Sequence, residues 1–460
     1  MPSVASTVVT SAEHSPSPLR VLPADDAQRR VLHNEVHARP SARIRMPALV
    51  VYVAVLNEGI TREMEWQHLR QLPGQEDLTL EHLSGNFQRL RFANHTLKWE
   101  RHTEFTRYSL VQALPEDALA HGDDDTLIHS LVVAPQWLAT IPGRTVAAIM
   151  MAMVEGDVDD LEGMRQTGES WIEGRETMAS LLGLRRSCVM TDFRLRDSGF
   201  EHLLVISPPG TTELRVGRIS QRLLELETYR LMALRGLPVA KEMGPLLTQA
   251  ESQLAEIMAR MENAETSDQE LLNTLIGLAA RIERATATHM YRFSATMAYQ
   301  SLVEQRIEQL RETPIPGTQT VGEFMLRRLS PAIATVQATS QRLSSLSQRV
   351  ERASALLRTR VDIATESQNQ MLLEKHTKGQ DLQLRLQSTV EGLSIAAIAY
   401  YVVSLILYVG KAGKAAGLPV NPEILAGALI PLVLAGVCWG PRQLPETLTH
   451  RDGHRARSHE

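Results

Sequence analysis

Aromatic residues and cysteines are scarce in this sequence. Phe, Trp and Tyr account for 4% of its 460 residues, which argues against the aromatic platforms on which single-stranded nucleic acid stacks. Two cysteines are too few for a disulfide framework, so a reducing compartment fits. A formal net charge of −5 gives no overall attraction to nucleic acid, and we expect no nucleic-acid partner.

Motifs that mark the common enzyme classes are also missing. The sequence contains no glycine-rich phosphate loop, no CxxC pair, no nucleophile elbow and no kinase motif set. Residues 1–22 lack the charged and long apolar segments of a secretory signal, so we expect a disordered tail there. The abundant residues are Leu, Ala, Glu, Arg and Gln, a composition that favours long helices.

Two uncharged apolar runs lie near the C-terminus, at residues 392–410 and 424–440. A helix needs roughly 20 apolar residues to cross about 30 Å of hydrocarbon, and the first run meets that length. The second run is shorter, but Asn421 and Pro422 offer an N-cap and a first-turn proline before it. We therefore expect a two-helix transmembrane hairpin with the lipid bilayer as partner. The alternative is a helical pair buried in a soluble domain.

Basic residues beside these runs indicate an orientation. The connecting loop holds two lysines, whereas three basic residues precede the first run and four arginines follow the second. The residues are Lys411 and Lys414 in the loop, Lys375, Lys378 and Arg385 before the first run, and Arg442, Arg451, Arg455 and Arg457 after the second run. Because basic residues are enriched on the cytoplasmic side, we expect both termini in the cytoplasm of an inner-membrane protein, with 441–460 as a basic tail.

Residues 23–210 are expected to form a mixed α/β head domain. Apolar, β-branched or alternating runs predict strands at 47–56, 86–93, 96–105, 129–135 and 189–196. Helical spacing predicts helices at 63–72 and 176–186. The order of the strands does not follow from the sequence.

Residues 211–391 predict a long antiparallel helical stalk, which makes the whole chain α+β. We expect helices at 218–234, 240–263 and 268–311, then one from Ser330-Pro331 into the first apolar run. Along this last helix, alternating steps of four and three from 329 to 364 find apolar residues at eight of eleven positions, a coiled-coil seam. The seam can pack on the preceding helix or on a second copy. We expect both, and hence a homo-oligomer.

Two polar segments could carry chemistry. In LHNEVHARP (32–40), His33 and His37 lie four residues apart, the helical spacing at which two imidazoles can bind one metal. The plainer interpretation is a hydrogen-bonded segment in which an arginine pairs with a carboxylate. In WERHTEF (99–105), strand alternation would place Glu100, His102 and Glu104 on one face, which by default is a solvated sheet surface.

Convergence of the two segments would create a metal site. His33, His37 and His102 would then supply nitrogen ligands to a divalent metal such as zinc, and Glu104 a carboxylate ligand or general base. Arg39 or Arg101 would clamp an anionic substrate, and Glu35 is a further catalytic candidate. A metal-dependent hydrolase is the hypothesis that follows.

Four strings carry a resemblance to a known family: LHNEVHARP (32–40), WERHTEF (99–105), ELETYRLMALRGLP (225–238) and LQSTVEGLSIAAIAYYVVSL (386–405). The chain resembles an uncharacterised family of bacterial membrane-anchored proteins, a domain of unknown function that spans essentially the whole chain. This resemblance implies no established activity. Because the polar strings belong to it, it favours a shared site on the head domain over packing alone.

The layout also resembles the CorA-type magnesium channels, which implies an ion channel or transporter. However, the Gly-Met-Asn sequence of that family is missing after the first run, where this chain reads Tyr408-Val409-Gly410-Lys411. Lys411 and Lys414 would repel a dication at the mouth of such a channel. The sequence therefore favours a membrane-anchored, cytoplasm-facing oligomeric scaffold or binding module, with a channel and a metal-dependent hydrolase as alternatives.

Overall fold

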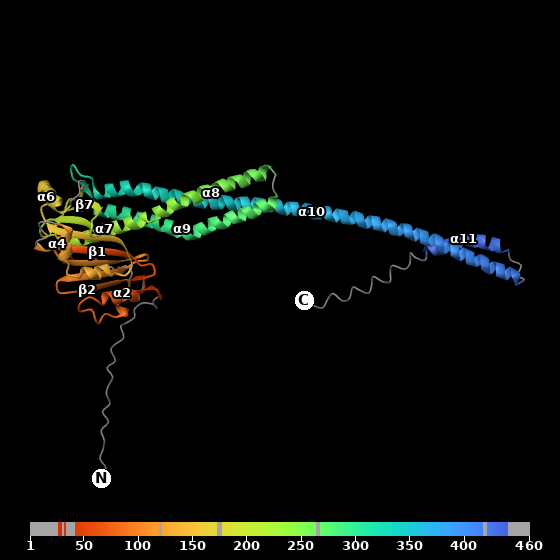
Figure 1. Ribbon diagram of the computed structural model, residues 1–460, viewed down its shortest axis with the longest axis horizontal. Helices are drawn as coiled ribbons and strands as arrows, with labels where there is room; N and C mark the ends of the chain where they lie inside the picture. The colour runs from red at the N-terminus through yellow and green to blue at the C-terminus, as the bar shows by residue number, and fades with distance from the viewer. Residues whose placement is uncertain are drawn as a thin grey trace, which may run out of the picture. The chain divides into compact units, whose positions relative to one another are not determined.

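The computed structural model describes residues 26–29, 32–33, 42–116, 118, 122–172, 177–263, 267–416 and 421–439. The fold is α+β, with a nine-stranded mixed sheet in the N-terminal part of the chain and long helices after it (Figure 1). The chain divides into two units, Met1–Ala264 with Thr274–Arg352, and Glu265–Asn273 with Ala353–Glu460.

The sheet of the first unit has the strand order β2-β3-β4-β1-β5-β8-β7-β6-β9. Among the pairings between these strands, β5 with β8 is parallel and the others are antiparallel. The strands are β1 Ala48–Leu56, β2 Phe87–Arg91, β3 His95–Arg101, β4 Phe105–Ala113, β5 Arg144–Glu155, β6 Met178–Leu182, β7 Ser187–Leu195, β8 Glu201–Ser207 and β9 Thr313–Pro314.

Helices cover both faces of this sheet. One face packs on α2 Arg62–Leu69, the 3₁₀ helix η1 Leu80–Leu83, α4 Asp124–His129, α5 Pro135–Ala139 and α6 Leu161–Trp171, and the other on α7 Glu213–Leu234. Every residue of β1 is buried, because this central strand is covered on both sides. Its uninterrupted apolar run is typical of such strands.

The helix α7 lies unusually close to the chain segment that leads into β1. A Cβ atom built on Gly217 would lie 1.7 Å from the carbonyl oxygen of Ala42. Only glycine fits at this contact, so Gly217 sets how closely α7 approaches the backbone at Ala42.

Three long helices follow, α8 Gly236–Asn263, α9 Asp268–Leu310 and α10 Val321–Ala415. In the first unit they run side by side and alternate in direction (Figure 1). Arg281 of α9 bonds Gln253 of α8, and Arg342 Nη2 of α10 lies 2.6 Å from a carboxylate oxygen of Glu251 in α8. The apolar seam positions from Leu329 to Val350, for example Leu343, are buried in this bundle, so their partners there belong to the same chain.

In the second unit, α10 continues to Ala415 and is followed by α11 Pro422–Trp439, which starts at the predicted proline. By length and composition, α10 is the one described helix able to cross a membrane, and Pro422–Val437 is a shorter apolar helix. The core helix of a soluble protein can have the same length and apolar composition, but such a helix is mostly buried. Here 6% of the most apolar window of α10 is buried.

Three local predictions are wrong. The predicted strand 129–135 is the end of α4 and the start of α5, because Pro135 begins a helix there. The predicted helix 176–186 contains β6, whose residues are all buried between β7 and β9. The predicted strand 96–105 ends at Arg101, and His102–Glu104 form the turn into β4.

The other predicted elements are confirmed with shifted ends. The strands at 47–56, 86–93 and 189–196 and the helix at 63–72 correspond to β1, β2, β7 and α2. The three helices predicted between 218 and 311 are α7, α8 and α9, and the last helix begins nine residues earlier, at Val321. The predicted tails 1–22 and 441–460 lie outside the described residues.

We expect Gly217→Ala to destabilise the first unit strongly, because the added methyl group would collide with the backbone of Ala42. Gly277→Ala in α9 is the matched control, since nothing lies within 4 Å of its Cβ position. There alanine should stabilise the helix by about 0.5–1 kcal/mol. Urea unfolding followed by circular dichroism measures both changes, and equal stability of the two variants would contradict the close contact.

Candidate functional site

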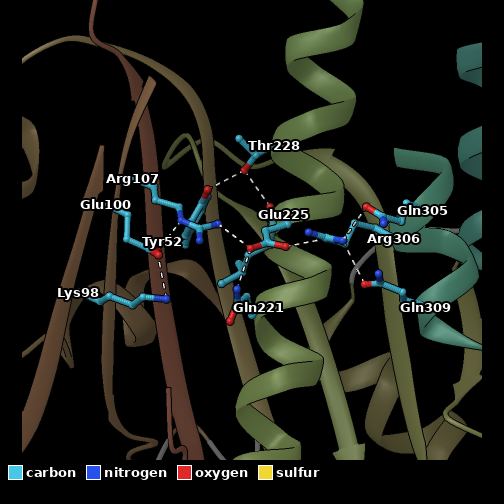
Figure 2. Close-up of polar contacts among 11 residues, drawn as sticks. Tyr52, Lys98, Glu100, Arg107, Gln221, Glu225, Thr228, Gln305, Arg306 and Gln309 are labelled. Atoms are coloured by element: carbon cyan, nitrogen blue, oxygen red, sulfur yellow. Dashed lines mark hydrogen bonds and ion pairs between the residues drawn. The ribbon is translucent and has the colours of Figure 1, made fainter. Parts of the chain in front are cut away.

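The densest group of charged side chains in the head lies buried between the sheet and α7 (Figure 2). Lys98 and Glu100 are two apart on β3 and share a face, and Glu100 is directly opposite Arg107 in the register of β3 with β4. Glu225 reaches them from α7. These four residues are 1–6% exposed, so each charge depends on its neighbours rather than on water.

A continuous chain of ion pairs connects these residues. Arg107 Nε lies 2.5 Å from Glu100 Oε2, and Lys98 Nζ lies 3.1 Å from the same oxygen. Arg107 Nη1 lies 3.2 Å from Glu225 Oε1, and Arg306 of α9 donates from Nε to Glu225 Oε2 at 2.6 Å. The cluster therefore links two strands to α7 and α9, with three positive and two negative charges.

Neutral side chains complete the network. Gln221 Nε2 donates to Glu225 Oε1 at 2.8 Å. Thr228 donates its hydroxyl to the carbonyl oxygen of Leu224 at 2.8 Å, so Tyr52, whose hydroxyl lies 2.7 Å from Thr228 Oγ1, is the donor to Thr228. Burial raises the pKa of Tyr52 well above its usual value, so its hydroxyl keeps its proton.

Electrostatics keep the two carboxyl groups ionised. Burial alone would raise the pKa of Glu100, but Arg107 and Lys98 outweigh it and hold that pKa at about 2. The pKa of Glu225 is also lowered, since Arg107, Gln221 and Arg306 outweigh the effect of burial. Burial lowers the pKa of Lys98, an effect that Glu100 partly offsets.

This cluster is built to hold the fold together rather than to bind a substrate. The cavity beside it measures about 30 Å³, enough for a water molecule but far below the volume of a ligand site. Removing one partner would leave a buried charge without compensation, which is more costly than losing an exposed ion pair. The sequence prediction of a solvated sheet face at Glu100 is therefore wrong.

A second buried group fastens α7 to β8. Burial, and then the negative charge of Glu227, raise the pKa of Glu201 to about 9, although Arg230 opposes this. Burial beside a second carboxyl group therefore favours one proton on the Glu201–Glu227 pair. Arg230 is ion-paired with Glu227, and its Nη2 lies 3.5 Å from Glu201 Oε1.

The remaining candidates in WERHTEF are also engaged within the fold. Arg101 Nη1 lies 2.7 Å from Glu65 Oε2, a fully buried carboxylate, and Arg101 Nη2 donates to the carbonyl oxygen of Ile60 at 2.8 Å. Glu104 is ion-paired with Arg292 of α9. The ring of His102 stacks on that of Phe105 with centroids 4.5 Å apart.

A pocket of about 680 Å³ lies beside this turn. His102 and Arg101 line it together with Tyr229 and Tyr299, and its described lining contains no carboxylate. The pocket is large enough for a small ligand.

The other predicted metal ligands are placed only in part. His33 lies in a short exposed helical stretch, whereas Glu35, His37 and Arg39 lie outside the described residues. Within the described part of the chain, no three His, Cys, Asp or Glu side chains are close enough to hold a metal ion. The metal site with His37 stays a prediction.

Sequence reasoning missed Lys98, Arg107, Glu225 and Arg306. Arg107 was open to prediction, because it lies across a short turn from Glu100 on the next strand. Glu225 begins ELETYRLMALRGLP, one of the four strings that carry the resemblance, but its contact with Arg107 joins residues 118 positions apart.

These features define an α+β protein with a sheet domain, a helical bundle and an exposed apolar C-terminal segment, and with head charges that stabilise the fold. Residues 24–448 match the model of a family described as a protein of unknown function (DUF3422), and the chain belongs to that family. The resemblance to an uncharacterised family is thereby confirmed. No curated protein matches the chain.

We expect Glu100→Gln to lower the free energy of unfolding at pH 7 by roughly 3 kcal/mol, because Lys98 and Arg107 lose their shared carboxylate. The folded pKa of about 2 lies below the usual carboxyl pKa of 4.5, so this stabilisation is present above pH 4.5 and disappears as the pH falls toward 2. Urea unfolding at several pH values should show the difference between wild type and variant shrinking over that range.

Glu162→Gln is the matched control, because Glu162 forms an exposed ion pair with Arg165. It should leave stability unchanged at every pH. A difference between wild type and Glu100→Gln that stays constant down to pH 2 would show that charge is not the cause.

Proposed function

We propose that this chain is a membrane-anchored protein whose head and helical bundle face the cytoplasm and serve as a scaffold or binding module. The observation that carries the proposal is the exposure of the apolar run at 392–410. Large side chains such as Leu393, Leu405 and Val409 are 66–68% exposed there. A soluble protein rarely exposes an apolar patch of this extent, whereas a bilayer would cover it.

The second apolar helix supports a hairpin. In α11, Ile424 and Leu432 are 70% and 67% exposed. At its start, Pro422 lies against α10, since a Cβ atom on Gly410 would be 3.2 Å from Pro422 Cβ. The basic residues before the first run favour a cytoplasmic stalk under the positive-inside rule.

We also propose that a second copy of the chain packs on the middle of α10. Side chains 362–394 are all exposed in the second unit, including Leu382 and Leu386, which share one helix face. Helices in proteins draw most of their stability from packing on a partner. A parallel neighbour anchored in the same bilayer would supply that partner over this length.

The anchor is tested with arginines inside the apolar run. Val402→Arg combined with Leu405→Arg should move the protein out of the alkali-resistant membrane fraction, because each arginine costs about 2.5–3.5 kcal/mol at the centre of a spanning helix. Leu372→Arg with Leu373→Arg is the control, since both leucines are equally exposed on the polar part of α10. Wild-type protein that is released by alkali would refute the anchor.

The oligomer is tested by light scattering of the full chain in detergent. Wild type should show a multiple of the chain mass, and Leu382→Glu with Leu386→Glu should shift it toward the monomer by placing charges in the contact. Gln380→Glu with Gln387→Glu adds the same charge on the opposite helix face and should leave the mass unchanged. A monomeric wild type across a wide concentration range would contradict the proposal.

A further inference from the structure

A third cavity of the head, distinct from the buried cluster and from the pocket beside His102, is lined by five arginines. Its volume is about 450 Å³, and it lies where the β6–β7 turn, α7 and the end of α9 meet. The arginines are Arg186 from the turn, Arg215, Arg218 and Arg222 from α7, and Arg311 after α9. The three from α7 are three and four residues apart, so they lie along one helix face.

The described lining of this cavity contains no carboxylate that would neutralise the arginines. Two of the guanidinium groups are held by backbone oxygens instead. Arg222 Nη1 donates to the carbonyl of Gln309 at 3.0 Å, and Arg215 Nη2 lies 3.4 Å from the carbonyl of Gly183. Such contacts fix the direction of the side chains while leaving their positive charge uncompensated.

The arginines lie close enough to lower one another's pKa. Burial, and then Arg186 and Arg218, lower the pKa of Arg215. Burial lowers the pKa of Arg222 as well, followed by Arg218 and other arginines, with only a small opposing effect of Glu225. A bound anion would relieve this repulsion.

The rim of the cavity carries backbone strain. Leu184 and Arg311 both line it and have φ values of 64° and 49°, in the left-handed region that non-glycine residues rarely adopt. Leu184 is also 69% exposed, so packing of its side chain does not account for the conformation. The two residues lie in the β6–β7 hairpin turn and directly after α9, where positive φ values are common, and they border the cavity.

We propose that this arginine pocket binds a small anion that carries two or more phosphoryl groups. Arginine is the residue best suited to this chemistry, because its planar fork bonds two phosphate oxygens at once. The positive charge of five arginines exceeds the charge of about −1.5 to −2 that a single phosphate carries, so one phosphate cannot neutralise it. The volume lies within the range of small-ligand sites. This inference is independent of the membrane anchor.

Calorimetric titration of the full chain with inorganic triphosphate, in mild detergent, tests the site. We expect saturable binding that Arg218→Gln combined with Arg311→Gln weakens by about tenfold or more per arginine. Both side chains are exposed, so the fold should persist, and circular dichroism checks this. If the glutamine variant unfolds, the Lys variant of the same two positions keeps the charge and should still lose affinity with the arginine fork.

The matched control is Arg45→Gln with Arg165→Gln, which removes two exposed arginines elsewhere on the first unit. It should bind triphosphate as wild type does. Absence of saturable binding would overturn the proposal, because it would mean that the protein has no triphosphate site. Equal weakening by both pairs of substitutions would also overturn it, because triphosphate would then respond only to the overall positive charge of the protein.

The source of the phosphoryl groups is resolved by repeating the titration in mixed micelles with and without cardiolipin, a lipid that carries two phosphates. If cardiolipin reduces the apparent affinity for triphosphate in wild type but not in the glutamine variant, the pocket binds a lipid headgroup. If it has no effect while triphosphate still binds, the ligand is a free polyphosphorylated molecule. Both results support the pocket.

Discussion

The position of α7 against the sheet depends on the buried guanidinium of Arg107. This single group contacts a carboxylate of β3 and a carboxylate of α7, and it is 3% exposed. A buried charge is tolerated only where its partners are held in place. Neither Glu100 nor Glu225 can therefore move without exposing an uncompensated charge, which ties the helix to the strands more specifically than apolar packing alone.

Glycine and ion pairs play complementary parts along α7. Near its N-terminal end, Gly217 permits backbone contact with Ala42, and this contact requires only that residue 217 has no side chain. Further along, Glu225 and Glu227 lie two residues apart and are held by different arginines, Arg107 and Arg230. The helix is thus fixed at three places within about three turns, and the bundle that follows starts from a defined position.

Elements whose structure is specified by their own residues could be predicted from the sequence, whereas elements that depend on distant residues could not. β1 and the α10 helix were predictable because their own apolar patterns specify them. β6 was not, because what makes its five residues a strand is pairing with β9, whose residues lie more than 130 positions later. The charge of Glu100 was visible in the sequence, but its burial depends on the packing of α7, which carries Glu225 and lies more than 100 residues later in the chain.

The two groups of arginines in the head differ in what surrounds them, and this difference separates structure from binding. Arg107, Arg230 and Arg292 each contact a carboxylate, so their charge is already balanced within the fold. In the arginine pocket, Arg215 and Arg222 contact backbone carbonyls, which orient a guanidinium without neutralising it. Five arginines therefore meet at one cavity whose described lining contains no carboxylate, and their charge is available to a partner outside the fold.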